Sequence, residues 1–210
     1  MFGLAPNWLR FVVKPVVFVV CLLPLALLVR GAVEGDLGAN PLERVTDVTG
    51  QWGLRLLLIT LAMTPLRLLT GSPDWIRLRR MFGLFAFFYA SLHFLIWIWL
   101  DQELHWANML ADIAKRPFVT VGFTAWLLLL PLALTSTRGM MRRLGRRWKP
   151  LHRMVYLVAV LGVLHYIWLV KADLLQPAIY AAILALLLVV RWRPHWLPGT
   201  AWVGRLIKAR

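Results

Sequence analysis

Apolar residues gather in six runs along the chain, each close to the roughly 20 residues that an α-helix needs to cross a bilayer. Polar and charged residues collect in the segments between the runs. This pattern predicts an all-α integral membrane protein, a six-transmembrane-helix bundle that forms a single domain over residues 1–210. The predicted spans are about 12–30, 51–69, 81–100, 117–135, 151–170 and 177–192, and a basic tail follows over 193–210.

The charged residues are distributed unevenly over the segments between the runs. The formal net charge is +15, and most of the 24 Lys and Arg residues lie in the N-terminal segment, in the loops 71–80 and 136–153, and in the tail. Of the nine acidic residues, only Asp74 lies in those segments. Short basic loops stay in the cytoplasm, so both termini are predicted to be cytoplasmic. Such alternation is typical of membrane orientation and argues against a nucleic-acid partner.

Other features narrow the class of protein. The chain is 60% hydrophobic, against roughly 45–50% in soluble domains. Its one cysteine, Cys21, excludes an intrachain disulfide and a cysteine-ligated cluster. No P-loop, GxGxxG, HExxH or GxSxG motif is present. We therefore predict no catalytic residues and no nucleotide-binding module, so that electrons, if the chain carries them, come from a partner or from quinol.

Two histidines lie deep in predicted spans, His93 in FGLFAFFYASLHFLIWIWL and His165 in MVYLVAVLGVLHYIWLV. An ionisable group inside a bilayer is costly and usually functional. At about 1.5 Å per residue, both histidines lie roughly 18–21 Å along parallel spans, in the predicted outer half of the membrane. Two such imidazoles are suited to hold one haem iron from opposite sides, and Gly162 would let a flat macrocycle approach the backbone. The alternative is that each histidine forms a hydrogen bond to a neighbouring helix.

A third histidine, His152, stands at the predicted cytoplasmic start of the fifth span. A second cofactor beneath the first would need a partner low on the third span, where Arg79 and Arg80 stand instead. Arginine stays protonated and is a poor iron ligand, but it binds propionate or phosphate well. On a straight helix, His152 is also about 140° away from the face of His165. His152 is therefore either an interfacial, non-ligand histidine or part of a second cofactor site.

The arginines allow two interpretations each. Arg55, near the outer end of the second span, either extends to the membrane surface or contacts a haem propionate or a partner. The basic loops around 77–80 and 138–153 either serve orientation alone or bind anionic membrane lipid, a flavin phosphate or an acidic electron donor. The tail is either an interfacial helix or a disordered basic segment.

Three segments together resemble a known family: TGQWGLRLLLITLAMTPLR at 49–67, RRMFGLFAFFYASLH at 79–93, and WKPLHRMVYLVAVLGVLH at 148–165. They are similar to the haem-binding membrane subunit of the periplasmic protein-methionine-sulfoxide reductase system. That subunit belongs to the ferric-reductase-like transmembrane group, which also contains the NADPH oxidases. The resemblance covers about residues 10–192.

The resemblance implies a six-helix, multi-pass protein of the bacterial inner membrane that binds haem b, and FMN has been associated with the same family. It implies a non-catalytic electron-transfer subunit, which passes electrons from quinol or a cytosolic flavin reductase to a periplasmic molybdopterin-containing methionine sulfoxide reductase that repairs oxidised envelope proteins. His93 and His165 correspond to haem ligands and His152 to a third histidine implicated in haem binding. At Arg79 and Arg80 the chain departs from the oxidase branch, which leaves the number of haems open.

A competing interpretation is a small histidine-dependent transporter or a proton-conducting protein. Such a protein needs carboxylates along its pathway through the membrane. None of the six predicted spans contains Asp or Glu. The sequence therefore favours electron transfer.

Overall fold

The computed structural model describes residues 6–170 and 173–192, so the predicted tail over 193–210 lies outside the described residues. The described residues form helices joined by short loops, with no strand among them, and six helical segments are long and apolar enough to cross a membrane. This confirms the prediction of an all-α bundle with six membrane-spanning helices. The helices are α1 (Pro6–Trp8), α2 (Lys14–Glu34), α3 (Pro41–Thr70), α4 (Asp74–Ile96), α5 (Trp106–Lys115), α6 (Pro117–Leu134), α7 (Arg138–Leu144), α8 (Trp148–Arg153), α9 (Val155–Leu169) and α10 (Leu175–Trp192).

Three short turns complete the chain path. A π-helical turn, Leu9–Val13, joins α1 to α2, and a second one, Trp97–Asp101, extends α4. A 3₁₀ turn, Gly145–Arg147, joins α7 to α8. The sequence pattern missed the short helices α5 and α7, because both lie in loops that are too polar to read as spans. It also predicted one continuous fifth span, whereas the helix is interrupted at Met154 between α8 and α9.

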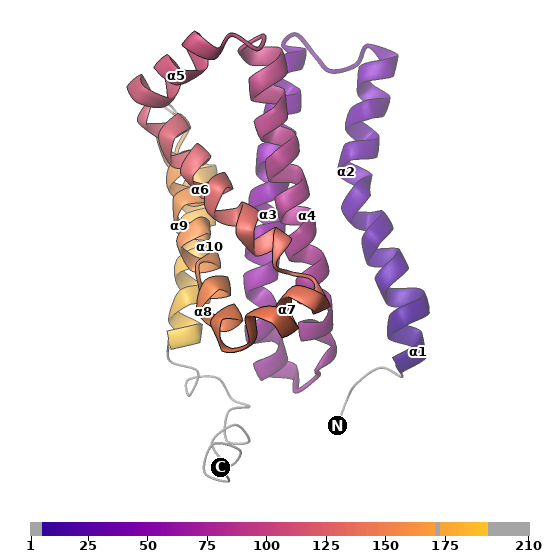
Figure 1. Cartoon of the computed structure of the whole chain (residues 1–210). Coiled ribbons are helices and arrows are strands. Elements are labelled where there is room, and N and C mark those ends of the chain that lie inside the picture. Colours follow the sequence, from indigo (N-terminus) through magenta and orange to yellow (C-terminus); the bar gives the residue numbers. More distant parts are fainter. Residues whose placement is uncertain (1–5, 171–172, 193–210) are drawn as a thin grey trace.

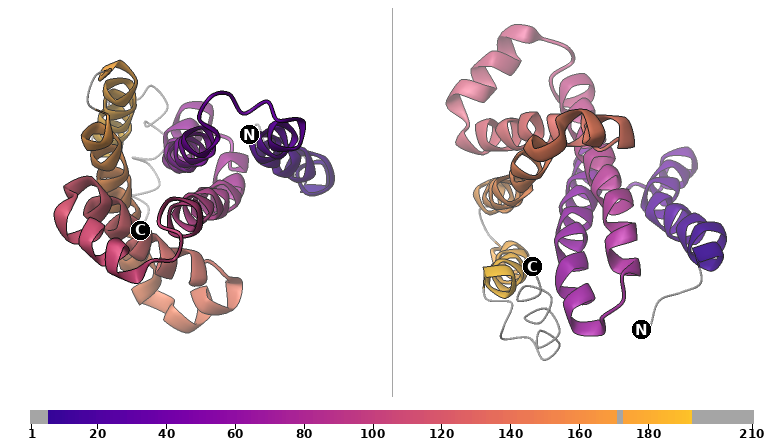
Figure 2. Two further views of the ribbon diagram at one scale, coloured as in Figure 1. Left: turned by 90° about the horizontal axis from the view of Figure 1, so that it is seen from above. Right: turned by 60° about the horizontal axis from the view of Figure 1, so that its bottom comes forward.

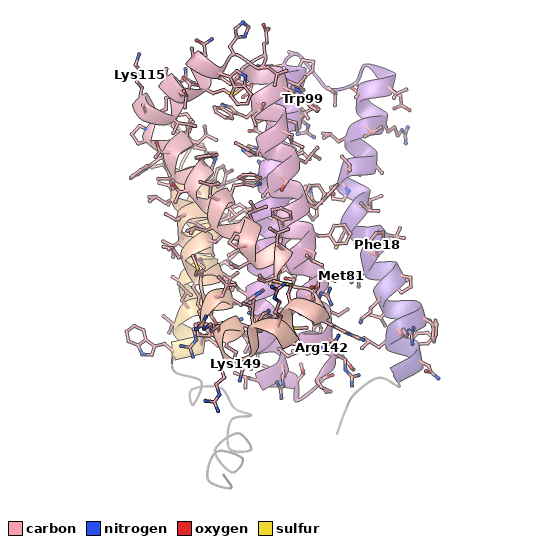
Figure 3. All side chains as sticks on the ribbon, in the orientation of Figure 1. Phe18, Met81, Trp99, Lys115, Arg142 and Lys149 are labelled. Atoms are coloured by element: carbon pink, nitrogen blue, oxygen red, sulfur yellow. The ribbon has the colours of Figure 1, made fainter. Side chains whose placement is uncertain are left out.

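The helices form a bundle with α3 and α4 at its centre (Figure 1). The helices α6, α9 and α10 lie on one side of this pair and α2 lies on the other, as the view from above also shows (Figure 2). Helix α5 caps one end of the bundle, and α7 and α8 lie at the other. The labelled side chains mark these ends, with Trp99 and Lys115 at the α5 end and Arg142 and Lys149 at the α7 end (Figure 3).

Local sequence explains where the central helices begin and end. The Asn40 side chain accepts a hydrogen bond from the Glu43 N–H at 3.4 Å and caps α3, with Pro41 at the first helical position. Helix α3 ends at Gly71, whose φ of 70° is a left-handed conformation that glycine adopts without strain. Helix α6 likewise begins at a proline, Pro117.

The centre of the bundle depends on close contact between α3 and α4. A Cβ atom added at Gly53 would come within 3.3 Å of the Ala90 backbone nitrogen, so a small residue is needed for the two backbones to approach. Close backbone approach at small residues is how helices associate in a bilayer, where the hydrophobic effect does not drive them together. Around this contact, Leu61, Tyr89 and Ala159 are fully buried.

Tyr89 also connects α2 to the rest of the bundle through hydrogen bonds. Its hydroxyl donates a hydrogen bond to the Cys21 carbonyl at 2.8 Å and accepts one from the Leu25 N–H at 3.2 Å. These two backbone groups lie one turn apart in α2, on either side of Pro24, which cannot donate a hydrogen bond. In the same interface the Phe18 and Phe85 rings pack edge-on, with ring centres 5.1 Å apart.

We therefore expect Tyr89→Phe to lower the free energy of unfolding by about 1 kcal/mol, because two backbone groups lose a buried partner. Thermal unfolding of the purified protein in detergent measures this loss. Tyr166→Phe is the matched control, since its hydroxyl donates to the exposed Gln176 at 3.1 Å. Equal or smaller destabilisation by Tyr89→Phe than by the control would contradict this role.

Candidate functional site

The structure brings His93 of α4 and His165 of α9 next to each other, with the rings in an edge-on arrangement. Their ring centres are 6.2 Å apart, and the ring planes meet at 80°. Both side chains line one cavity of about 370 Å³ between α3, α4, α6 and α9. Two residues that are 72 positions apart in sequence thus form the centre of a single site.

Each histidine is held by a backbone carbonyl of the helix beside it. His93 Nδ1 lies 3.1 Å from the Thr46 carbonyl oxygen, and His165 Nδ1 lies 2.7 Å from that of Phe118. A carbonyl only accepts hydrogen bonds, so Nδ1 carries the hydrogen in both rings and Nε2 keeps a free lone pair. Histidines that bind metals are fixed in this way. The hydrogen bond to a neighbouring helix, which was one of the two interpretations from the sequence, is therefore present, and it leaves Nε2 available.

The separation of the rings fits a metal ion held between them. A metal–imidazole bond is about 2 Å and the ring centre lies about 1 Å farther on, so a shared metal separates the ring centres by about 6 Å. Among the described residues, no three His, Cys, Asp or Glu side chains are grouped so that they could hold a metal ion. Two imidazoles leave the other ligand positions of a metal open, which suits a metal macrocycle that brings its own ligands.

Two glycines make room for the histidine rings. A Cβ atom at Gly50 would lie 3.1 Å from His93 Nδ1, and one at Gly122 would lie 2.6 Å from His165 Nδ1. A side chain at either position would push the ring away from its carbonyl partner. The sequence interpretation missed both glycines. A signal was present, since Gly50 and Gly122 are 72 residues apart, as are the two histidines.

Aromatic and small residues form the walls of the cavity. Phe94 packs against Trp126 with ring centres 4.4 Å apart, and the Trp126 Nε1–H donates to Ser91 Oγ at 3.1 Å. Gly162 lies in the opposite wall, where an added Cβ would be 3.5 Å from a Leu54 methyl carbon. The walls are thus apolar, which suits a flat hydrophobic ligand.

The charged side chains that line the cavity lie at its α5 end. They are Asp47 near the start of α3, Asp101 at the end of the π-helical turn, and Arg116, which immediately precedes α6. Arg116 forms an ion pair with Asp112 at 3.3 Å. The cavity is therefore polar at one end and apolar along its length.

His152 is separate from this pair. Its Nε2 lies 3.0 Å from Thr135 Oγ1, and its ring stacks on Trp148 with centres 4.0 Å apart. The Trp148 Nε1–H in turn donates to the Thr135 carbonyl at 3.0 Å. His152 does not line the cavity of His93 and His165.

The two predicted arginines differ from each other. Arg79 is half-buried and lies close enough to His152 and Arg191 to interact electrostatically with both, whereas Arg80 is exposed. Arg191, which the sequence interpretation missed, donates from Nη1 to the Tyr156 hydroxyl and from Nη2 to the Leu61 carbonyl at 2.6 Å. Its buried Nε has no partner among the described residues. A basic cluster of Arg79, Arg191 and His152 thus lies near the α7 end.

Arg55 belongs to neither site. Its Nε donates to the Tyr180 hydroxyl at 2.7 Å, and its Nη2 donates to Gln51 Oε1 at 2.9 Å. The guanidinium also lies over the Trp52 ring, 5.1 Å from its centre. Arg55 therefore joins α3 to α10.

Comparison with known proteins gives consistent results. The chain matches the family described as "Ferric reductase like transmembrane component" over residues 49–163. It is 60% identical over 179 residues to the protein-methionine-sulfoxide reductase heme-binding subunit MsrQ of Rhodospirillum rubrum, a match that covers 85% of this chain and 86% of that protein. Proteins of the same name from Ralstonia nicotianae and Bordetella pertussis are 54% and 52% identical and are each covered over 90% of their length. No solved structure matches significantly.

The glycine contacts predict a graded effect of added methyl groups. Gly122→Ala should destabilise the protein more than Gly50→Ala, because its Cβ would overlap the His165 ring at 2.6 Å against 3.1 Å for His93. We expect losses of about 1–3 kcal/mol, measured by thermal unfolding in detergent. Gly139→Ala in α7 is the control, since nothing lies within 4 Å of its added Cβ. Equal stability of all three variants would contradict the close approach of the rings.

Proposed function

The chain belongs to the MsrQ haem-binding subunits within the ferric reductase like transmembrane family, and on this basis we propose that it is a single-domain electron-transfer subunit binding haem b. It passes electrons from quinol or a cytosolic flavin reductase to a periplasmic molybdopterin-containing methionine sulfoxide reductase, which repairs oxidised envelope proteins. The six apolar helices and the family together identify a multi-pass protein of the bacterial inner membrane.

The observation that carries the proposal is that both histidines line one cavity while Nδ1 of each is bonded to a backbone carbonyl, which leaves both Nε2 atoms free. His93 and His165 would hold the haem iron through Nε2, and their carbonyl partners fix the tautomer that this requires. The haem iron, when bound, supplies a centre that takes up and releases one electron at a time. The protein holds both rings rigidly, which suits a centre that changes charge without changing ligands.

The direction of transfer follows from the charges at the two ends. The α7 end holds the basic loops and the α5 end holds most of the acidic residues, so we place the α7 end and both termini in the cytoplasm. The histidine pair, at the polar α5 end of the bundle, then lies nearer the periplasm. This position suits delivery of electrons to a periplasmic enzyme.

Electrons enter, in this proposal, at the α7 end. Arg79, Arg191 and His152 gather there, and these cations suit an anionic group such as an FMN phosphate or a membrane-lipid headgroup. The exposed Arg80 extends the same surface. His152 stays a candidate ligand of a second cofactor, because its Thr135 bond is one that a metal could replace.

The purified protein should be red and should show a sharp α band on reduction with dithionite. His93→Ala or His165→Ala should abolish that band, because each removes one of the two imidazoles that would hold the iron. His105→Ala is the control, since this exposed histidine bonds only its own loop at Gln102. A colourless wild-type preparation from haem-replete cells, or a full band in both ligand variants, would overturn the proposal.

The ratio of haem to protein tests the role of His152. We expect His152→Ala to keep the haem held by His93 and His165, since His152 lies outside that cavity. A ratio near one in both wild type and variant identifies His152 as a non-ligand. A fall from about two to about one identifies a second haem at the α7 end, and complete loss would contradict the separation of the two sites.

A further inference from the structure

The cavity around the two histidines is built twice from one pattern. Twelve of its lining residues lie between Thr46 and Trp97, and twelve lie between Phe118 and Leu169. Adding 72 to each residue number of the first set gives the second set without exception, so that 46 becomes 118, 93 becomes 165 and 97 becomes 169. The same positions of two segments therefore face one cavity.

The interactions repeat with the residues. Each histidine bonds the carbonyl of a residue 47 positions earlier, and each ring lies against a glycine four residues after that carbonyl. The first unit comprises α3 and α4, and the second comprises α6 and α9. Because equivalent faces point toward each other, the two units are related by an approximate twofold rotation between the histidines. The units are therefore an internal structural repeat.

The repeat identifies residues that the cavity lining alone does not. Besides its 24 paired residues, the cavity is lined by Asp101 and Arg116 at its α5 end. Subtracting 72 from Arg116 gives Arg44, so the same residue type stands at the equivalent position. Each arginine precedes by two residues the carbonyl that holds a histidine, at Thr46 and at Phe118. Both are exposed, and Arg44 interacts electrostatically with the cavity residue Asp47.

From this arrangement, and resting on the proposed haem function, we propose that Arg116 and Arg44 form an acid-binding rim that holds the two carboxylates of the macrocycle, one on each repeat. A flat macrocycle with a central metal and two acid groups on one edge matches this cavity. The metal would lie between the two histidines, and the acid groups would lie at the polar α5 end. Asp47 and Asp101 already place two carboxylates at this end, so added acid groups need cations beside them, and Arg116 is the one Arg or Lys that lines the described cavity. The ion pair between Arg116 and Asp112 holds the first of these arginines at the rim.

The test compares haem with its dimethyl ester, which lacks both carboxylates. The full-length protein is purified in detergent from haem-depleted cells, and each compound is titrated while the Soret absorption is followed. We expect the wild type to bind haem more tightly than the ester. Arg116→Gln and Arg44→Gln should each reduce that preference about tenfold, and the double variant should lose it. The ratio of the two affinities is compared between the wild type and each variant. The different partition of the two compounds into detergent is the same for every protein and cancels in this comparison.

Lys115→Gln is the matched control, because this exposed neighbour of Arg116 does not line the cavity. An unchanged preference for haem over the ester in both arginine variants would overturn the inference. Haem binding by those variants would leave the proposed function intact. Loss in Arg116→Gln alone would overturn the assignment of Arg44. A wild type that binds neither compound would refute the proposed function itself. Circular dichroism and thermal unfolding confirm that each variant is folded.

Discussion

The hydrogen bond from each histidine Nδ1 to a backbone carbonyl is the interaction on which the site depends. It selects the tautomer, sets the direction of Nε2, and ties α4 to α3 and α9 to α6. A side-chain partner could rotate away, but a carbonyl in a helix is fixed by the helix itself. The bond also requires the ring to lie on the neighbouring backbone, which is why glycine stands at 50 and 122. Packing in the bundle and chemistry in the cavity therefore have the same origin.

The sequence predicts those residues of the site whose presence inside a bilayer costs free energy. Six apolar runs identify the helices, and two histidines inside them are conspicuous because few ionisable groups are tolerated there. The partners of those histidines could not be predicted in the same way, since every residue has a carbonyl and only the fold selects Thr46 and Phe118. The contacts of Arg191 could not be predicted either, because a basic residue at the end of a membrane helix is expected to serve orientation alone. The structure instead places it among Tyr156, Leu61 and Arg79.

The two ends of the bundle are built on different principles. At the α5 end, both repeats contribute equivalent groups around the histidine pair. At the α7 end the equivalence is lost, because His152 has Arg80 at the corresponding position and the second unit is interrupted at Met154. On the short helix α8, His152 stacks on Trp148. The two repeated units thus form a symmetric site at the α5 end and an asymmetric, basic surface at the α7 end.

The division of the cavity between two helical hairpins has a consequence for biogenesis. Each hairpin contains its own histidine–carbonyl bond, but neither lines the whole cavity. A ligand bound by both histidines bridges the hairpins, and its binding free energy is added to the stability of their association. With the proposed ligands, cofactor insertion would be the step that completes tertiary assembly. The cellular abundance of the subunit should follow haem supply, because chains without the bridge remain open to membrane proteases.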